Sequence, residues 1–175
     1  GRGRVRTFIR EADRLPRVWT FVRARLDEGR QAYVVYPRIE EEPGAAGLKA
    51  VRAEFARLEK QFAPHRVALL HGRLSAEEKE AVVGAFRDGR VAVLVTTSVI
   101  EVGLDVANAT VMVIENAESY GLAQLHQLRG RIGRGAADAW CILVAAVATP
   151  EAHARLKALE EHQDGFRIAE LDLQL

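Results

Sequence analysis

The densest chemical signal in the sequence is a run rich in arginine and glycine at residues 124–135. It holds Arg129, Arg131 and Arg134, interleaved with three glycines. Because glycine weakens helices and arginine avoids burial, packing in a core does not explain this pattern. Planar guanidinium groups on a closely folded backbone suit a polyphosphate, whose charge they offset during phosphoryl transfer. The run therefore indicates phosphate chemistry.

Two further polar segments could contact phosphate. Residues 96–105 contain three consecutive hydroxyl side chains, followed by Gly103 and Asp105. Hydroxyl groups at a strand end can donate to phosphate oxygens, although a capped short helix would explain them as well. The sequence at residues 71–73, His-Gly-Arg, lets the backbone approach an anion beside a helix N-terminus. A tight turn with a solvated arginine fits the same three residues equally well.

The apolar pattern predicts the elements that position these segments. Continuous apolar runs predict strands at residues 32–36, 67–70, 91–95, 111–114 and 140–147. Helical spacing predicts helices at residues 15–26, 48–62, 75–89, 122–128 and 150–162, the third opened by a capping box of Ser75 and Glu78. Apolar strands that alternate with helices indicate an α/β fold, a parallel sheet with helices on both faces. Ligands of such sheets bind beyond the carboxyl ends of the strands, where we expect the polar segments.

The overall composition sets the class of protein. The 25 Lys and Arg against 24 Asp and Glu give a net charge of +1, so the chain as a whole is no polycation. Its 175 residues, 49% of them hydrophobic, fit one globular domain. One cysteine rules out a disulfide framework, and the histidines show no metal-ligand spacing. Without a membrane-length apolar run or a secretory signal, we expect a soluble, intracellular protein with no membrane partner.

Several strings in the chain resemble a known family. Residues 127–134 resemble motif VI of superfamily 2 helicases, and residues 97–105 resemble their motif V, in the same order and spacing. Residues 114–118, 121–131 and 164–170 further resemble the RecG-type branched-DNA helicases. The transcription-repair coupling translocase shares the long motif VI string but fits less well at residues 115–118 and 164–170, so it is the second candidate.

The resemblance implies a fold and roles for individual residues. Residues 13–149 would form the second RecA-like domain of a helicase motor, of the P-loop NTPase type. Arg134 would be the arginine finger, and Arg131 would touch the terminal phosphate of ATP with it. Gln127 would link that phosphate to the nucleic-acid side, and Gly103 and Asp105 would line the nucleotide cleft.

The resemblance also implies partners. Thr97 together with the turn of Gly72 and Arg73 would hold the phosphates of one strand of a branched or forked DNA. The first RecA-like domain of a longer chain would bind most of the ATP and its Mg²⁺, and a wedge domain would bind the branch. Residues 150–175 would begin a helical hairpin used in translocation, and residues 1–12 look like a linker or loosely held arm. The resemblance also implies that the protein is bacterial and lies in the cytoplasm, at the nucleoid.

Half of a motor's active site is missing from this sequence. It contains no G-x-x-x-x-G-K-[ST] phosphate loop, and its one Asp-Glu pair, Asp27 and Glu28, ends an amphipathic helix and is expected to be solvated surface. We therefore expect the chain alone to lack ATPase and helicase activity. A catalytically silent binding module with the same fold is the alternative from another class of protein, but such a module would have little use for both motif VI arginines.

Overall fold

A six-stranded sheet organises the chain, with the strand order β1-β6-β5-β2-β4-β3 and every neighbouring pair parallel. The computed structural model describes residues 4–37, 46–97, 104–146 and 150–161. The strands are β1 (Val5–Glu11), β2 (Gln31–Val35), β3 (Val67–Leu70), β4 (Val93–Thr96), β5 (Ala109–Ile114) and β6 (Ala139–Ala145). The helices are α1 (Leu15–Asp27), α2 (Ala46–Phe62), α3 (Ala76–Arg87), α4 (Leu122–Arg129) and α5 (Pro150–Glu161), with short 3-10 turns η1 (Ala12–Arg14) and η3 (Ala117–Ser119).

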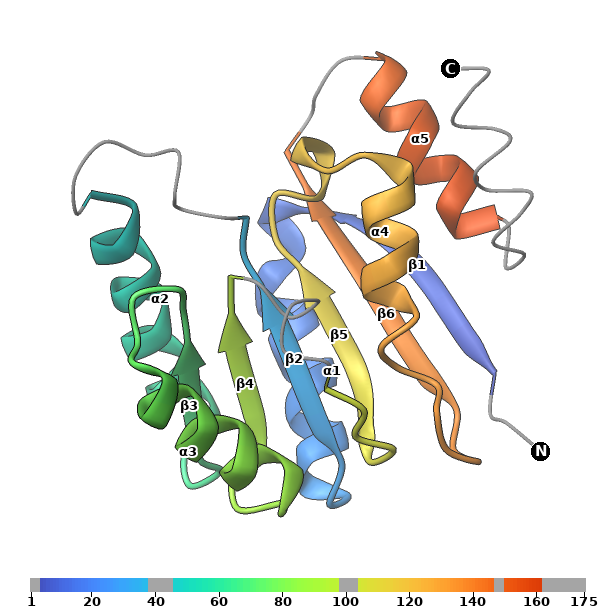
Figure 1. Cartoon of the computed structure of the whole chain (residues 1–175). Coiled ribbons are helices and arrows are strands. Elements are labelled where there is room, and N and C mark those ends of the chain that lie inside the picture. The colour runs from blue at the N-terminus through green and yellow to red at the C-terminus, as the bar shows by residue number, and fades with distance from the viewer. Residues whose placement is uncertain (1–3, 38–45, 98–103, 147–149, 162–175) are drawn as a thin grey trace.

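The helices cover both faces of the sheet, as the sequence predicts (Figure 1). Helices α1 and α2 pack on one face, where Val22 and Phe62 meet apolar side chains of the central strands. Helices α3, α4 and α5 pack on the other face through Phe86, Leu125 and Leu159. Strands β2, β4 and β5 are buried along their whole length, because each lies between two strands and beneath two layers of helices. The sheet therefore separates two apolar cores.

The parallel topology gives the sheet two chemically different edges. All strands end at the same side, here called the carboxyl edge, and begin at the opposite side, the amino edge. Helix α4 leaves the carboxyl edge after β5 and must return the chain to the amino edge, where β6 begins. The loop at residues 130–138 therefore lies at the amino edge, which is the lower side in Figure 1.

The prediction of a loosely held arm at residues 1–12 is wrong for the segment that forms β1. Strand β1 pairs with β6 along its full length, with Thr7 beside Cys141 in the register. Exposed arginines on this strand lower its apolar content, so the apolar pattern did not predict a strand there.

The backbone groups of Ile9 in β1 bond to side chains. The N–H of Ile9 donates to Glu160 Oε2 at 3.0 Å, and the carbonyl of Ile9 accepts from Arg10 Nη1 at 2.6 Å. The N–H and the carbonyl of Ile9 on this edge strand thus have side-chain hydrogen-bond partners.

The remaining local predictions agree with the structure. The Ser75 hydroxyl accepts from the Glu78 N–H at 3.0 Å, and Glu78 Oε1 accepts from the Ser75 N–H at 2.9 Å, which completes the capping box. Cys141 is buried in β6 and serves packing, while Asp27 and Glu28 are exposed. Helix α5 agrees with the helix predicted at residues 150–162, and the rest of the expected hairpin lies outside the described residues. No helix among the described residues is both long and apolar enough to cross a membrane.

A buried arginine joins three elements of the second core. Arg129, the last residue of α4, is 5% exposed, and its Nη1 donates to Thr7 Oγ1 of β1 and to the Leu159 carbonyl of α5, both at 3.2 Å. Burial lowers the pKa of this guanidinium, and the nearby thiol of Cys141 opposes that shift. An arginine nonetheless stays protonated in proteins. One of the three motif VI arginines is therefore structural, contrary to the expectation that a core could not explain them.

Glu115 is a second buried polar group, at the carboxyl edge directly after β5. Its N–H donates to the Val35 carbonyl at 2.8 Å, and its side chain is 7% exposed. Burial raises the pKa of the Glu115 carboxyl to about 7, the neighbouring Tyr36 hydroxyl opposes this, and Glu118 adds to it. The protein therefore holds an uncharged carboxyl in conditions where an exposed glutamate would be ionised.

We expect Arg129→Ala to lower the free energy of unfolding by about 2–4 kcal/mol, because it removes two charged hydrogen bonds and leaves a cavity. Urea denaturation followed by circular dichroism measures the loss. Arg6→Ala, an exposed arginine of β1, is the matched control and should change stability by less than about 0.5 kcal/mol. Equal effects of the two substitutions would show that the buried contacts do not matter.

We expect Glu115→Gln to flatten the pH dependence of stability. The folded pKa of about 7 lies above the ordinary value of 4.5, so the stabilising contribution of the protonated carboxyl is complete below pH 4.5 and is lost as the pH rises to 7. Above pH 7 the variant should therefore be more stable than the original chain, by at most about 3 kcal/mol. Unfolding free energies measured across this range test the prediction, and a difference that does not vary with pH would contradict it.

Candidate nucleotide and nucleic-acid site

Motif VI places its arginines on a loop between α4 and β6. Gly130 caps the C-terminus of α4, and the chain then turns through Gly133, whose φ of +76° favours glycine. Arg131 is half-buried in this loop, while Arg134 is exposed. The loop therefore holds Arg131 at its base and presents Arg134 at its tip.

The glycines of this loop are needed because it packs closely on the protein itself. A Cβ at Gly133 would overlap the side chain of Val5 in β1. A Cβ at Gly135 would lie 3.2 Å from the carbonyl oxygen of Ala107, which is closer than side chains ordinarily come. The loop is thus clamped between β1 and the segment that precedes β5. This fixed backbone sets the direction in which Arg134 can reach.

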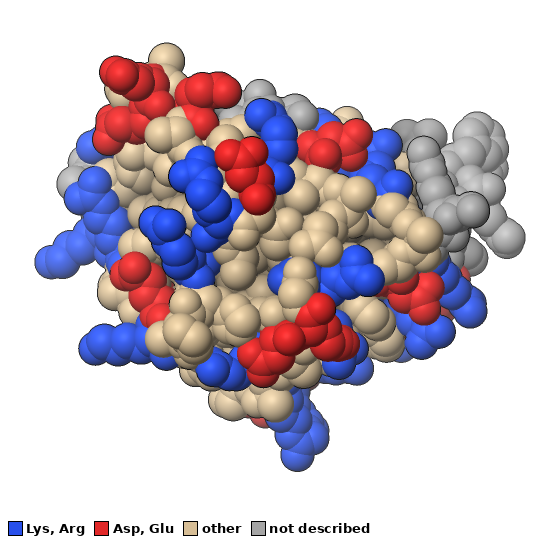
Figure 2. All heavy atoms as spheres, turned by 90° about the horizontal axis from the view of Figure 1, so that it is seen from below, with Lys and Arg blue, Asp and Glu red and all other residues tan. Residues whose placement is uncertain are grey.

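Arg134 and Asp105 lie close together at the amino edge. Arg134 Nε is 3.8 Å from Asp105 Oδ1, and the two side chains are 37% and 67% exposed. An ion pair that is this long and this exposed contributes about 0–1 kcal/mol. Figure 2 views this amino edge and shows acidic and basic side chains interspersed rather than gathered by sign. The guanidinium is therefore held only loosely by its carboxylate.

Tyr33 is a neighbour of this group that the sequence did not reveal. It lies in β2 and is fully buried, its ring 5.1 Å from that of Phe86. Burial raises the pKa of its phenol, Asp105 adds to this, and Arg131 opposes it. Among the described residues the hydroxyl has no hydrogen-bond partner. A tyrosine within a buried apolar run was the available signal, because a buried phenol usually needs a partner.

Gln127 and Gly103 are the other residues predicted to serve the nucleotide. Gln127 is exposed on the last turn of α4. Gly103 lies outside the described residues. The structure therefore brings together Asp105, Arg131 and Arg134. The roles of Gln127 and Gly103 stay predictions.

The residues predicted to hold nucleic acid lie at the opposite edge of the sheet. Gly72 and Arg73 form an exposed turn directly after β3. Thr97 follows β4 and is 5% exposed, and its N–H donates to the Leu70 carbonyl at 3.4 Å. Strands β3 and β4 are neighbours in register, so the turn and Thr97 are close together.

The expectation that all the polar segments lie at the carboxyl edge is wrong for motif VI. It is correct for the turn of Gly72 and Arg73 and for Thr97, which follow strands directly. Arg131 and Arg134 precede β6, and Asp105 precedes β5, so these residues lie at the amino edge. The crossover through α4 accounts for the place of Arg131 and Arg134, and Asp105 lies at the amino edge because it directly precedes β5.

This amino-edge group suits one side of a nucleotide site. It offers two guanidinium groups and a carboxylate, which can face phosphate oxygens and a ribose hydroxyl respectively. It offers no phosphate-cradling loop, because the sequence lacks one. Among the described residues no group of three His, Cys, Asp or Glu side chains could hold a metal ion. The chemistry present therefore fits contact with an anionic ligand such as a phosphate group.

Comparison with known proteins identifies the family. The model of the helicase conserved C-terminal domain matches residues 14–136. The chain is 47% identical over 175 residues to the ATP-dependent DNA helicase RecG of Synechocystis sp., across 100% of the chain and 21% of that protein. It is 48% identical to RecG of Thermotoga maritima, across 99% of the chain and 22% of that protein. The chain thus spans about a fifth of the length of these curated relatives.

Solved structures support the same assignment. A structure of RecG bound to a three-way DNA junction matches with a TM-score of 0.83 and 47% identity, over 99% of this chain and 22% of that one. The C-terminal domain of the DEAD-box protein Dbp5 matches with a TM-score of 0.60 at 16% identity, over 99% of this chain and 97% of that one, and shares the RecA-like fold. The chain therefore belongs to the helicase conserved C-terminal domain family and is RecG-like in sequence over its whole length.

Proposed function

We propose that this chain is the second motor domain of an ATP-dependent DNA helicase or translocase that remodels branched DNA. The observation that carries the proposal is the exposed Arg134 on a glycine-clamped loop, with only a weak ion pair to Asp105. A guanidinium in this setting can leave its carboxylate for a phosphate at little cost. The RecG relatives, one of them solved with a three-way DNA junction, support branched DNA as the substrate.

On this proposal the amino-edge residues complete a nucleotide site whose other half belongs to the first RecA-like domain of a longer protein. Hydrolysis of ATP, bound there with Mg²⁺, supplies the free energy for movement. Arg134 is the arginine finger, and Arg131 binds the terminal phosphate from the base of the loop. Asp105 and Gly103 line the nucleotide cleft, and Gln127 links it to the nucleic-acid side. Excess negative charge on the phosphates is thereby offset from across the cleft.

The carboxyl edge provides the contact with DNA. Gly72 and Arg73 form an exposed turn that can reach backbone phosphates, and Thr97 supports it from the neighbouring strand. A wedge domain elsewhere in the longer protein would hold the branch point. Because the RecG relatives described above come from bacteria, we place the protein in the bacterial cytoplasm, at the nucleoid.

We expect the 175-residue chain alone to hydrolyse no ATP, with or without DNA, because its sequence has no phosphate-cradling loop. Phosphate release measured with a branched DNA present tests this. Turnover that DNA stimulates in the pure chain would contradict the division of the site between two domains.

In the longer protein that contains this chain, we expect Arg134→Ala to reduce DNA-stimulated ATPase by roughly 10³–10⁵-fold with ATP binding largely kept, since an arginine finger acts on the transition state. Arg90→Ala is the matched control, because Arg90 is also exposed and pairs with an aspartate, Asp88, at 3.2 Å. An unchanged rate in the Arg134 variant would make this arginine structural and would favour the silent binding module.

A further inference from the structure

A buried histidine shapes the turn that follows β3. His71 is 5% exposed, and its Nδ1 accepts the backbone N–H of Arg73 at 3.1 Å. Its carbonyl accepts the N–H of Leu74 at 3.3 Å, which closes the turn. A ring nitrogen that accepts a hydrogen bond carries no proton, so this geometry requires the neutral imidazole. His71 is thus built into the backbone of the turn that presents Gly72 and Arg73.

Positive charge from three separate elements surrounds this histidine. Burial lowers the pKa of His71, and the nearby cations Arg52 of α2, Arg73 of the turn and Lys79 of α3 lower it further. Glu78 opposes them, but its carboxylate accepts the Ser75 N–H in the capping box. The charges that face His71 are therefore three cations and one acid that is already engaged.

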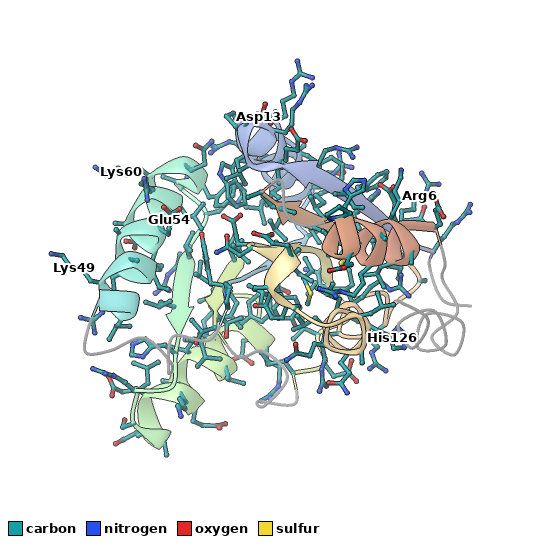
Figure 3. The ribbon with its side chains drawn as sticks, turned by 90° about the horizontal axis from the view of Figure 1, so that it is seen from above. Arg6, Asp13, Lys49, Glu54, Lys60 and His126 are labelled. Carbon is teal, nitrogen blue, oxygen red and sulfur yellow. The ribbon has the colours of Figure 1, made fainter. Side chains whose placement is uncertain are left out.

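Two of these cations have no ion-pair partner in the described part of the chain. Arg52 is exposed and Lys79 half-buried, and no acidic side chain there pairs with either of them. Helices α2 and α3 lie on opposite sides of β3, as Figure 3 shows from the carboxyl edge. The cations thus approach the turn from both faces of the sheet.

A ligand with several phosphates in a row fits this arrangement better than one compact anion. Cations that straddle the end of an edge strand are separated along a line, as the phosphates of a nucleic-acid backbone are. We propose that Arg52 and Lys79 bind the phosphodiester backbone of DNA beside the Gly72–Arg73 turn, and that His71 is the positioning residue for this turn. The inference rests on the proposed function, since it extends the same DNA contact.

The first test compares two double variants of equal charge. Arg52→Ala with Lys79→Ala removes the cations near the turn, whereas Lys60→Ala with Arg87→Ala removes cations from the far ends of the same helices, α2 and α3. Binding of the chain to a fluorescein-labelled three-way DNA junction is followed by anisotropy across a salt series. We expect the first pair to reduce the slope of log K against log salt by about two, and the control pair to leave it unchanged.

The outcomes separate this inference from the proposed function. If the original chain binds the junction and both double variants lose affinity equally, the site near the turn is overturned while DNA binding stands. If the original chain does not bind DNA at any salt concentration tested, both the inference and the DNA contact of the proposed function fail.

The role of His71 is tested by rescue and by titration. The amide oxygen of His71→Asn can accept the Arg73 N–H, but His71→Leu cannot, so only the leucine variant should lose the salt-dependent contact. Saturating junction DNA should raise the pKa of His71 in NMR titrations of its ring signals, because bound phosphates neutralise the surrounding cations. Equal behaviour of the two variants, or a His71 titration that DNA does not move, would overturn the positioning role.

Discussion

The buried guanidinium of Arg129 is the constraint on which the motif VI loop depends. It ties the end of α4 to Thr7 of β1 and to Leu159 of α5. Four residues later Gly133 packs against Val5 of the same strand. The loop is therefore anchored to β1 at two points, and an edge strand that looks dispensable in the sequence forms the wall behind the candidate nucleotide site.

The second constraint is the distance between the two edges of the sheet. Strand β5 has 6 residues, so the amino edge and the carboxyl edge are roughly 20 Å apart. Paired strands and two apolar cores fill the space between them, and close-packed interiors do not deform continuously. On the proposed function, a change at Arg134 would reach the Gly72–Arg73 turn most directly through movement of the whole domain against the first RecA-like domain, as hinged two-domain proteins respond to ligands.

Much of this architecture could be predicted from sequence, because local signals and tertiary packing agree. The apolar runs of β2 and β5 and the capping box of α3 are each explained by neighbours in the chain. Strand β1 could not be predicted in this way, since pairing with β6 outweighs its arginine content. The edge on which the motif VI loop lies was missed for a related reason, because it follows from the crossover of α4 and not from the residues of the loop.

Burial also explains why spacing alone could not assign the three arginines of motif VI. Arg129 is 5% exposed and bonded to two other elements, whereas Arg134 is exposed and faces one carboxylate at 3.8 Å. Hydrogen bonds from a buried charge are worth about 1.5–3 kcal/mol each, and an exposed ion pair about 0–1 kcal/mol. A phosphate can therefore displace Asp105 from Arg134 without disturbing the contacts of Arg129. The same run of sequence thus combines a rigid base with a tip that is free to change partners, which is what an arginine supplied across a cleft requires.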